Sequence, residues 1–456
     1  MKKYRFIGLL QKDGWHEDVS VAIDNEGKIL SINKDHQDSE RVNGLVLPGF
    51  QNAHSHAFQY AMAGLVENYT FSRPTDDFWS WRETMYQIAL SIDPKDLESI
   101  AAMLYSEMVR HGYTHVAEFH YLHHDKAGKR YANLAEHGER LVLAAKTAGI
   151  KITLIPMFYQ MGGFGKDPGP QQRRFISPTL DDYMNLWDAS REITQLHGHA
   201  SIGYGIHSLR AVNSQDIERT LTNNFFSGPF HIHVSEQLKE VDECISFLGL
   251  RPVEWLMNRT GVDSNCHLVH ATHLTETEIK SITNRGAHVV LCPSTEGNLG
   301  DGIFPLRQFQ ELNGRWSVGT DSHIGLNPCE ELRILDYAQR LTTHKRNTFH
   351  TAGYTDGSLY AFHQTLQSGR ASMGSFQENY FSVSDPFDAV VFNAEIPLLA
   401  NTKKEKWLST ILYCSESSWI KGTVIDGKWV VINGKHLDHE KITAAFKNGM
   451  SKLRIR

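Results

Sequence analysis

Short apolar runs alternate with stretches of helical periodicity through most of the chain. Eight runs of strand length lie between residues 45 and 319, and the chain after each is long enough for a helix. Near-continuous apolar strands are typical of parallel sheets, because both faces of such a sheet are buried. Eight of them favour a closed (β/α)8 TIM barrel over an open doubly wound sheet. The predicted strands are 45–52, 114–119, 150–158, 200–206, 230–234, 266–270, 287–292 and 316–319.

The two ends of the chain show a different pattern, in which short alternating strands are separated by tight turns. Residues 4–48 turn at Asn25-Glu26-Gly27 and at Asn43-Gly44, which is typical of a small antiparallel sheet. Residues 388–392 read as a strand, and 422–434 read as a hairpin that turns at Asp426-Gly427. We therefore predict an α/β protein in which residues 49–384 form the barrel. Residues 1–48 and 385–456 are expected to form one small β-sandwich domain that ends in a helix at about 438–453.

Composition and charge narrow the choice of partners. The chain has 456 residues, and 46 Lys and Arg against 52 Asp and Glu give a formal net charge of −6. A slightly acidic chain lacks the basic surface that nucleic acid binding needs, so we expect no nucleic acid partner. No G-x-G-x-x-G or Walker A string follows a predicted strand, which argues against a nucleotide-binding fold.

The sequence also favours a cytoplasmic protein. No run of 18 apolar residues is present, so we expect no membrane partner. The apolar stretch after Arg5 spans only Phe6 to Leu10, which is too short for the core of a signal peptide. The five cysteines include no Cys-x-x-Cys pair, as expected for free thiols in a reducing compartment.

Ionisable residues follow nearly every predicted barrel strand, and histidine is unusually frequent, with 25 copies. Because the carboxyl ends of all barrel strands lie on one face, these side chains are expected to converge there. His54 and His56 are two residues apart on a strand, so both point to the same side. The strand ends carry His54 and His56, Glu118 and His120, His207 and Arg210, His233 and Glu236, His270 and His273, and Asp321 and His323.

Four of these residues predict a metal site. Three imidazoles from His54, His56 and His233 with the carboxylate of Asp321 suit one divalent ion, and such a site leaves room for a water molecule. Zinc is the expected ion, although Fe(II) suits the same ligands. No lysine ends the fourth predicted strand, so a carboxylated lysine that bridges two metals has no candidate. His231 shares the facing of His233 but lies deeper, and we expect it to be buried behind the ligands.

These residues resemble the amidohydrolase superfamily, specifically its branch of deaminases with one metal. The resemblance begins at Pro48-Gly49-Phe50, continues through the histidines and aspartate named above, and covers about residues 45–345. Longer strings are similar to the formimidoylglutamate deiminase family. They are His54-Ser55-His56-Ala57-Phe58-Gln59, Phe78-Trp79-Ser80-Trp81-Arg82-Glu83, Glu118-Phe119-His120-Tyr121-Leu122-His123-His124, Leu268-Val269-His270-Ala271-Thr272-His273-Leu274 and Asn298-Leu299-Gly300-Asp301-Gly302-Ile303-Phe304-Pro305.

The resemblance implies an enzyme of histidine degradation that hydrolyses the C=N group of N-formimidoyl-L-glutamate to N-formyl-L-glutamate and ammonia. The residues suit this reaction. Asp321 can accept the proton of the attacking water, and Glu236 can carry a proton to the departing nitrogen. His270 can hydrogen-bond the attacking oxygen and stabilise the tetrahedral intermediate.

A substrate with two carboxylates requires cationic side chains. Arg210 is the first candidate, because a planar guanidinium binds a carboxylate through two parallel hydrogen bonds. Arg82 is the second, and the resemblance implies that its aromatic-rich loop can reach the neighbouring subunit of a homodimer. Gln59, Tyr121 and His207 are candidate polar contacts. Phe78, Trp79 and Trp81 are expected to pack as local core, while 57–113 and the Gly-rich segment 161–170 are expected to build the pocket.

Two other functions stay open at this point. Another deaminase of the same superfamily, acting on a nucleobase or a related amidine, would use the same metal and acid. A purine has no carboxylates, however, and would leave the two arginines without a role. A non-catalytic metal-binding barrel would keep His54, His56, His233 and Asp321 but would need neither Glu236 nor His270. Ammonia release separates these classes.

Overall fold

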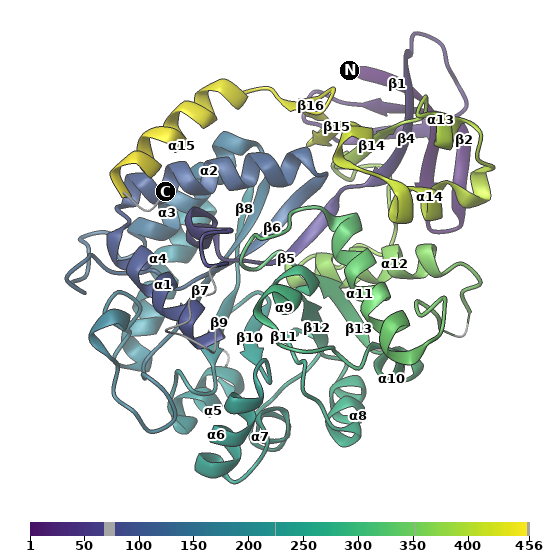
Figure 1. Ribbon diagram of the computed structural model, residues 1–456. Coiled ribbons are helices and arrows are strands. Elements are labelled where there is room, and N and C mark those ends of the chain that lie inside the picture. The colour runs from purple at the N-terminus through teal and green to yellow at the C-terminus, as the bar shows by residue number, and fades with distance from the viewer. Residues whose placement is uncertain (68–77, 224, 352, 454–456) are drawn as a thin grey trace.

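A parallel barrel and a separate sheet built from both chain ends make up the protein (Figure 1). The computed structural model describes residues 1–67, 78–223, 225–351 and 353–453. The predicted fold class is confirmed. Apolar side chains of both parts form one continuous buried core that includes Phe6 and Val391 of the terminal sheet and Phe50 and Val116 of the barrel.

The barrel strands are parallel throughout and follow one another in the order of the chain. The ring closes between its first and last strands, where Ser55 forms a parallel bridge to Asp321. The backbone N–H groups of Thr320 and Asp321 both donate to the His54 carbonyl at 3.0 Å. The strands are β5 (Phe50–Ser55), β6 (Tyr113–His120), β7 (Lys151–Phe158), β8 (Ala200–Ile202), β9 (Tyr204–Ser208), β10 (Phe230–Val234), β11 (Cys266–His270), β12 (His288–Leu291) and β13 (Arg315–Val318).

Two of the predicted strands are each divided in two. The predicted strand 45–52 breaks at Gly49, so that its first half ends a strand of the terminal sheet and its second half begins β5. A Cβ at Gly49 would lie 2.1 Å from Thr114 Cγ2, so only glycine fits where the chain passes from one sheet to the other. The predicted strand 200–206 breaks at Gly203, where a Cβ would lie 2.8 Å from the Pro229 carbonyl oxygen.

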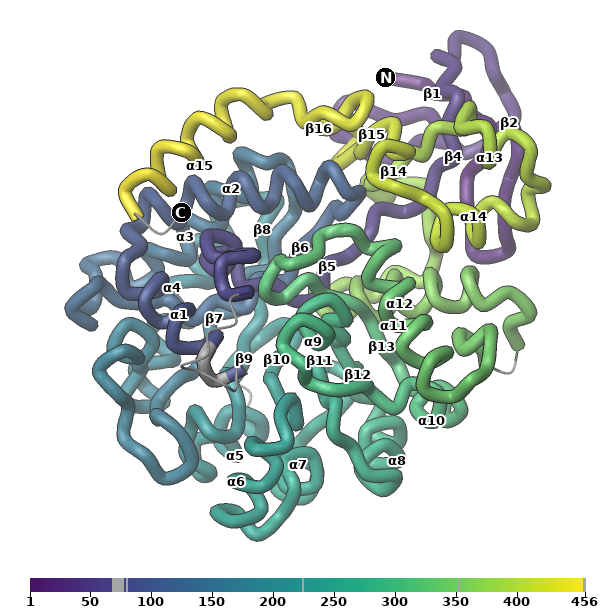
Figure 2. The backbone as a smooth tube through the Cα atoms, viewed as in Figure 1, coloured from purple at the N-terminus to yellow at the C-terminus, as the bar shows by residue number. Residues whose placement is uncertain are grey.

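Most of the helices surround the barrel as an outer layer (Figures 1 and 2). Local sequence signals mark their ends. In α8, for example, Thr275 accepts from the Glu278 N–H at 3.3 Å and the Glu278 carboxylate accepts from the Thr275 N–H at 2.9 Å, while Gly286 ends the helix at φ 68°. The helices are α1 (Phe78–Ser91), α2 (Pro94–Arg110), α3 (Glu136–Ala148), α4 (Leu180–Gln195), α5 (Ser214–Thr222), α6 (Leu238–Leu248), α7 (Pro252–Arg259), α8 (Glu276–Arg285), α9 (Pro293–Leu299), α10 (Leu306–Glu311), α11 (Pro328–Thr343), α12 (Gly357–Ser372), α13 (Pro397–Ala400), α14 (Trp407–Cys414) and α15 (His439–Leu453).

The terminal sheet joins strands that are more than 300 residues apart in the sequence, and Figure 2 shows the purple N-terminal strands beside the green and yellow C-terminal ones. The two halves meet where β4 pairs antiparallel with β14. The β15–β16 hairpin turns at Asp426-Gly427 as predicted. One pair differs from the antiparallel expectation: β1 and β4 run parallel, because the chain returns past β1 after forming the outer strand β3. The strands are β1 (Lys2–Gln11), β2 (Gly14–Ile23), β3 (Ile29–Asn33), β4 (Glu40–Pro48), β14 (Ala389–Asn393), β15 (Ile420–Ile425), β16 (Lys428–Ile432) and β17 (Lys435–His436).

The last helix returns from this sheet to the barrel. Figure 1 shows α15 lying along α2, and Lys452 Nζ contacts Asp96 Oδ1 at 3.1 Å. Within the described ranges, none of the helices has the length and apolar character that would be needed to cross a bilayer.

Candidate active site

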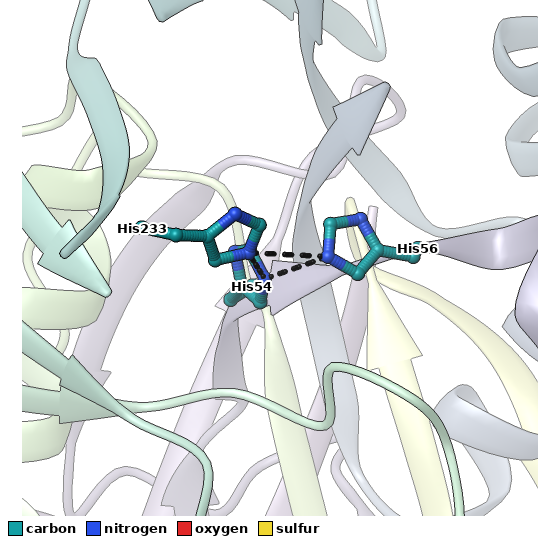
Figure 3. Close-up of side chains that lie close together, drawn as sticks. All are labelled: His54, His56 and His233. Carbon is teal, nitrogen blue, oxygen red and sulfur yellow. Dashed lines mark hydrogen bonds between the residues drawn. The ribbon is translucent and has the colours of Figure 1, made fainter. Parts of the chain in front are cut away.

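Three histidines from two barrel strands point their Nε2 atoms at one another (Figure 3). His54 lies on β5, His56 directly follows that strand, and His233 lies on β10. The Nε2–Nε2 distances are 3.1 Å between His54 and His56, 3.3 Å between His56 and His233, and 3.0 Å between His233 and His54. All three side chains are buried. The structure thus brings together the three histidines that the sequence proposes as ligands.

The opposite ring nitrogens show which tautomers are present. His56 Nδ1 lies 2.9 Å from the Phe119 carbonyl oxygen, and His233 Nδ1 lies 3.0 Å from the His207 carbonyl oxygen. A carbonyl accepts only from a protonated nitrogen, so each Nδ1 carries the proton and each Nε2 presents a lone pair. This is how metal-binding histidines are oriented in proteins.

Asp321 completes the cluster from the end of β13. Its Oδ1 lies 3.3 Å from His56 Nε2 and 3.6 Å from His54 Nε2. Burial lowers the pKa of His54 to about 3 and also lowers the pKa of His56 and His233. The pKa of Asp321 is lowered despite its burial, because the surrounding histidines stabilise the carboxylate. The cluster therefore contains neutral imidazoles and one anion.

These atoms fit a metal ion. Four ligands at about 2.0–2.1 Å from a tetrahedral zinc ion lie about 3.3 Å from one another, close to the separations observed here. The inward lone pairs of His56 and His233, the Nε2 of His54 and a carboxylate oxygen of Asp321 together form a suitable set of ligands for a cation. The protein thus has a histidine-rich cluster that is able to hold a metal ion.

A second group of ionisable residues adjoins this cluster. His270 Nε2 lies 3.5 Å from Asp321 Oδ2 and 3.7 Å from Glu236 Oε1, and all three side chains are buried. Burial alone would lower the pKa of His270, but Glu236 and the other neighbouring carboxylates raise it to about 10. Burial raises the pKa of Glu236 to about 7, against the opposing charges of His270 and Arg210. The three proposed catalytic residues therefore form one connected group.

A cavity opens directly above both groups. It holds about 530 Å³ of empty space, part of which is open to solvent. His56, His233, Glu236, His270 and Asp321 lie in its wall. The five residues that the sequence proposes as substrate contacts also line it: Gln59, Arg82, Tyr121, His207 and Arg210.

The two arginines come from different sides of the cavity. Arg210 follows β9, with its Nη1 3.7 Å from Glu240 Oε2 and its guanidinium 5.9 Å from the centre of the Phe78 ring. Arg82 belongs to α1 and lies 5.6 Å from the centre of the Tyr86 ring. Each arginine therefore packs on an aromatic ring while lining the cavity of its own chain.

The polar and aromatic walls differ in part from expectation. Gln59 donates to the Tyr121 hydroxyl at 2.9 Å. Phe78 is buried, Trp81 packs against the hydrophobic core, and their rings stack at 6.2 Å, in line with local core; both also line the cavity. They lie on the first turn of α1, which turns its side chains toward the barrel mouth. The side chain of Trp79 and residues 68–77 lie outside the described part of the chain, and the segment 161–170 contributes none of the described residues that line the cavity.

Positive φ angles gather where the strands end in this site. They occur at Ser235 after β10, at His270 and Ala271 at the end of β11, and at Asp321 and His323 after β13, with values from 46° to 65°. Residues other than glycine adopt this conformation at an energetic cost, which is met only where surrounding structure fixes the backbone. Two of these residues, His270 and Asp321, are also proposed catalytic residues.

Sequence reasoning assigned no role to several buried residues that support the site. Glu118 accepts hydrogen bonds beside His54 and His56, and His323 Nε2 accepts from the His56 N–H at 3.3 Å. Glu296 contacts His270 Nδ1 at 3.2 Å. Glu118 and His323 were visible in the sequence only as ionisable residues near strand ends, and Glu296 was not singled out at all, because the partners of these residues come from other strands.

His231 lies away from the cluster, as its deeper position suggests. It is fully buried, its Nε2 lies 3.0 Å from the Ser372 carbonyl oxygen at the end of α12, and its ring stacks on His267 at 4.8 Å. His267 stacks in turn on His288 at 4.8 Å. This ladder of rings fills the barrel below the ligands.

The fold and this site together define the class of the protein. The model of the Amidohydrolase family matches residues 45–354, which is more than half of the chain, so the chain belongs to the amidohydrolase family.

Individual relatives narrow the resemblance. The chain is 40% identical over 447 residues to a formimidoylglutamate deiminase from Pseudomonas aeruginosa, covering 97% of this chain and 98% of that protein. A crystal structure of an amidohydrolase from Brucella melitensis is 35% identical, with a TM-score of 0.91, and covers 99% of this chain and 100% of its own. An adenosine deaminase from Xanthomonas campestris, determined with bound zinc, shares the fold at a TM-score of 0.80 and 18% identity, with 100% of this chain and 98% of that chain covered.

Proposed function

We propose that the protein is a hydrolytic deiminase that converts N-formimidoyl-L-glutamate and water to N-formyl-L-glutamate and ammonia, a step of histidine degradation. One observation carries the proposal. Glu236, His270 and Asp321 lie beside the histidine cluster and line a cavity that is also lined by the guanidinium groups of two arginines. The near full-length similarity to a formimidoylglutamate deiminase supports the substrate. A nucleobase would leave Arg82 and Arg210 without carboxylates to bind.

The proposed cofactor is one divalent metal ion, zinc by preference, held by His54, His56, His233 and Asp321. When bound, such an ion makes water a stronger acid and so supplies a nucleophile at neutral pH. The neutral imidazoles and the carboxylate suit zinc and Fe(II) alike. Metal analysis of the purified protein decides between these ions.

The residues divide the proton transfers between them. Asp321 accepts a proton as water attacks the formimidoyl carbon. Glu236 delivers a proton to the imino nitrogen. As the C–N bond breaks, the proton held by Asp321 passes to the same nitrogen, which leaves as ammonia, and the hydroxyl proton returns to Glu236 while the carbon becomes the formyl C=O. His270 lies between these two carboxylates, 3.5 Å and 3.7 Å away, where its Nε2–H can donate to the oxygen that gains charge.

The cavity walls provide for the glutamate part of the substrate. Arg210 and Arg82 are proposed to bind its two carboxylates, with Gln59, Tyr121 and His207 as hydrogen-bonding partners. Phe78 packs beneath Arg210 and restricts where the guanidinium can point.

Ammonia release from a panel of amidines tests the function. The expected result is turnover of formimidoyl-glutamate well above formimidoyl-aspartate, cytosine, adenosine and guanine. Preference for a nucleobase would support the other deaminase function, and absence of ammonia from every compound would support a non-catalytic barrel.

We further propose that the protein is cytoplasmic and forms a homodimer. We also propose that residues 49–384 form the barrel domain and that residues 1–48 and 385–456 form the second domain. Light scattering on the purified protein determines the oligomeric state. Because Arg82 lines the cavity of its own chain, we propose that each subunit binds substrate with its own Arg82.

A further inference from the structure

We propose that Glu296 is a positioning residue for His270, which fixes the imidazole ring so that its Nε2 faces Glu236 and Asp321. This inference rests on the proposed function for its effect on turnover. The placement of the ring itself is independent of the substrate.

The two nitrogens of His270 face different groups. Nδ1 lies 3.2 Å from Glu296 Oε1 and donates to it, while Nε2 lies 3.5 Å from Asp321 Oδ2 and 3.7 Å from Glu236 Oε1. A ring turned by half a revolution would bring carbon atoms to both positions and lose all three contacts. Holding Nδ1 therefore decides what Nε2 can reach.

Glu296 is itself held in place. It lies in the first turn of α9, its N–H donates to the Cys292 carbonyl at 2.8 Å, and its Oε1 accepts from the Cys292 N–H at 2.8 Å. The side chain is only 7% exposed. The same oxygen thus receives one hydrogen bond from its own helix start and one from His270, and it joins β11 to the beginning of α9.

The backbone at His270 makes this contact consequential. His270 and Ala271 have φ angles of 65° and 48°, and the Ala271 N–H donates to the Val234 carbonyl at 3.0 Å. These constraints fix the direction of the Cα–Cβ bond, but they do not fix the rotation of the ring about the Cβ–Cγ bond. An acceptor at the far side of the ring selects one rotamer of that bond.

A purely structural role for Glu296, as a cap of α9, makes different predictions. Glu331 provides the matched control, because its buried carboxylate accepts from Ser294 N at 2.9 Å and from Ser294 Oγ at the same helix start. Loss of Glu331 weakens the anchoring of α9 without removing the acceptor for His270.

The experiment compares Glu296→Leu, Glu296→Gln and Glu331→Leu in the metal-loaded enzyme. Glu296→Leu removes the acceptor and should lower kcat by about 10- to 100-fold, with little change in KM or metal content. Glu296→Gln keeps an oxygen acceptor and should retain most of kcat. Glu331→Leu should lower Tm without this loss of kcat. Glu296→Ala, which also lacks the acceptor, takes the place of Glu296→Leu if the latter does not fold.

A double-mutant cycle shows whether Glu296 acts through His270. In a His270→Gln background, Glu296→Leu should cause no further loss of kcat, because the ring that it positions is gone. Equal losses in the two backgrounds would overturn the proposal.

A crystal structure of Glu296→Leu provides a readout without turnover. The His270 ring should rotate away from Asp321 and Glu236 in this variant and keep its place in Glu296→Gln. An unmoved ring in Glu296→Leu would overturn the proposal. If the wild type releases no ammonia from formimidoyl-glutamate, the proposed function fails, while the position of the ring still decides the role of Glu296.

Discussion

The carboxylate of Glu118 accepts a hydrogen bond from the Ser55 hydroxyl at 2.6 Å, between the two histidines of the His54-Ser55-His56 segment. Its other oxygen accepts from the Ala57 N–H at 2.6 Å. One side chain at the end of β6 therefore fixes the segment that presents His54 and His56, although it binds no metal itself.

We predict that Glu118→Leu weakens metal binding by about 10- to 100-fold, because outer residues that orient the ligands contribute about that much to affinity. Competition with a chromophoric chelator measures the change. Glu331→Leu is the matched control, since Glu331 also binds a serine hydroxyl and a backbone N–H, both of Ser294, and contacts no residue of the segment that presents His54 and His56 in the hydrogen bonds of its carboxylate. Equal metal loss in both variants would contradict a specific role of Glu118.

We predict one divalent metal ion per chain. The three imidazoles lie 3.0–3.3 Å apart, and Asp321 Oδ1 lies 3.3 Å and 3.6 Å from two of them, as expected for the ligands of a single ion. Elemental analysis should find one equivalent in the wild type and clearly less in Asp321→Ala, and chelation should remove activity that zinc or Fe(II) restores. Two equivalents in the wild type would contradict this prediction.

We predict that Glu236→Gln retains the metal and the fold but lowers kcat by about 100-fold or more, because a placed proton donor contributes about 10² to 10⁴ to the rate. The amide has the shape of the carboxylate but cannot transfer its proton. Steady-state ammonia release measures the loss, and circular dichroism and metal analysis are the controls. Near wild-type turnover would move the proton transfer to another residue, with His270 as the first candidate.

The convergence of the site residues was predictable because it depends on periodicity. Alternation along a strand places His54 and His56 on one side, and a parallel barrel brings all strand ends to one face. Residues such as His54 and Asp321, which are 267 positions apart, therefore meet without any knowledge of side-chain packing. The hairpin at Asp426-Gly427 was predictable for a similar local reason.

The supporting contacts were not predictable from the sequence. Glu118 and Ser55 are 63 positions apart, and Glu296 and His270 are 26 apart, so nothing in the local pattern links them. That Phe78 and Trp81 line the cavity as well as packing in the core was not predictable, because the sequence pattern of an aromatic side chain is the same in both places. The break at Gly49 was hidden because the apolar pattern continues across it into two different sheets.

We predict that the contact of Lys151 with the terminal sheet stabilises the protein up to high pH. Lys151 begins β7, and its Nζ lies 2.6 Å from Asp388 Oδ2 and 2.7 Å from Asp426 Oδ1. Burial alone would lower the pKa of Lys151, but the two carboxylates raise it above its usual 10.5. A raised pKa in the folded state means that the contribution is fully present below the usual pKa of 10.5 and disappears as the pH rises through the folded value.

Lys151→Met should therefore lower the free energy of unfolding by about 2–3 kcal/mol at pH 8, somewhat less than the loss of a fully buried pair, because Asp426 is partly exposed. Above the folded pKa of the lysine, the difference between variant and wild type should shrink. Denaturant unfolding of the variant and the wild type at pH 8 and at pH 11 measures this difference. A difference that stays constant from pH 8 to pH 11 would contradict the ion pair as its source.

The last prediction concerns how the enzyme selects its substrate. If Arg210 binds a substrate carboxylate, Arg210→Met leaves that charge partly desolvated and unpaired, at a cost of about 2–5 kcal/mol in kcat/KM. The structure adds a complication, because Arg210 Nη1 lies 3.7 Å from Glu240 Oε2 and Glu240 accepts from the Glu236 N–H at 3.0 Å. Removing the arginine alone leaves Glu240 as a buried anion beside the proposed acid, which could lower turnover of any substrate.

The comparison therefore uses Arg210→Met with Glu240→Gln against Glu240→Gln alone, so that the buried charge is absent from both enzymes. Formimidoyl compounds that keep the matching carboxylate should lose the whole 2–5 kcal/mol, a range of about 30- to 5,000-fold in kcat/KM. Compounds without it should react poorly with the parent and lose little more, because the contact was never made. Equal losses for both kinds of compound would reject Arg210 as the carboxylate-binding residue and favour Arg82, for which Arg82→Met provides the same test.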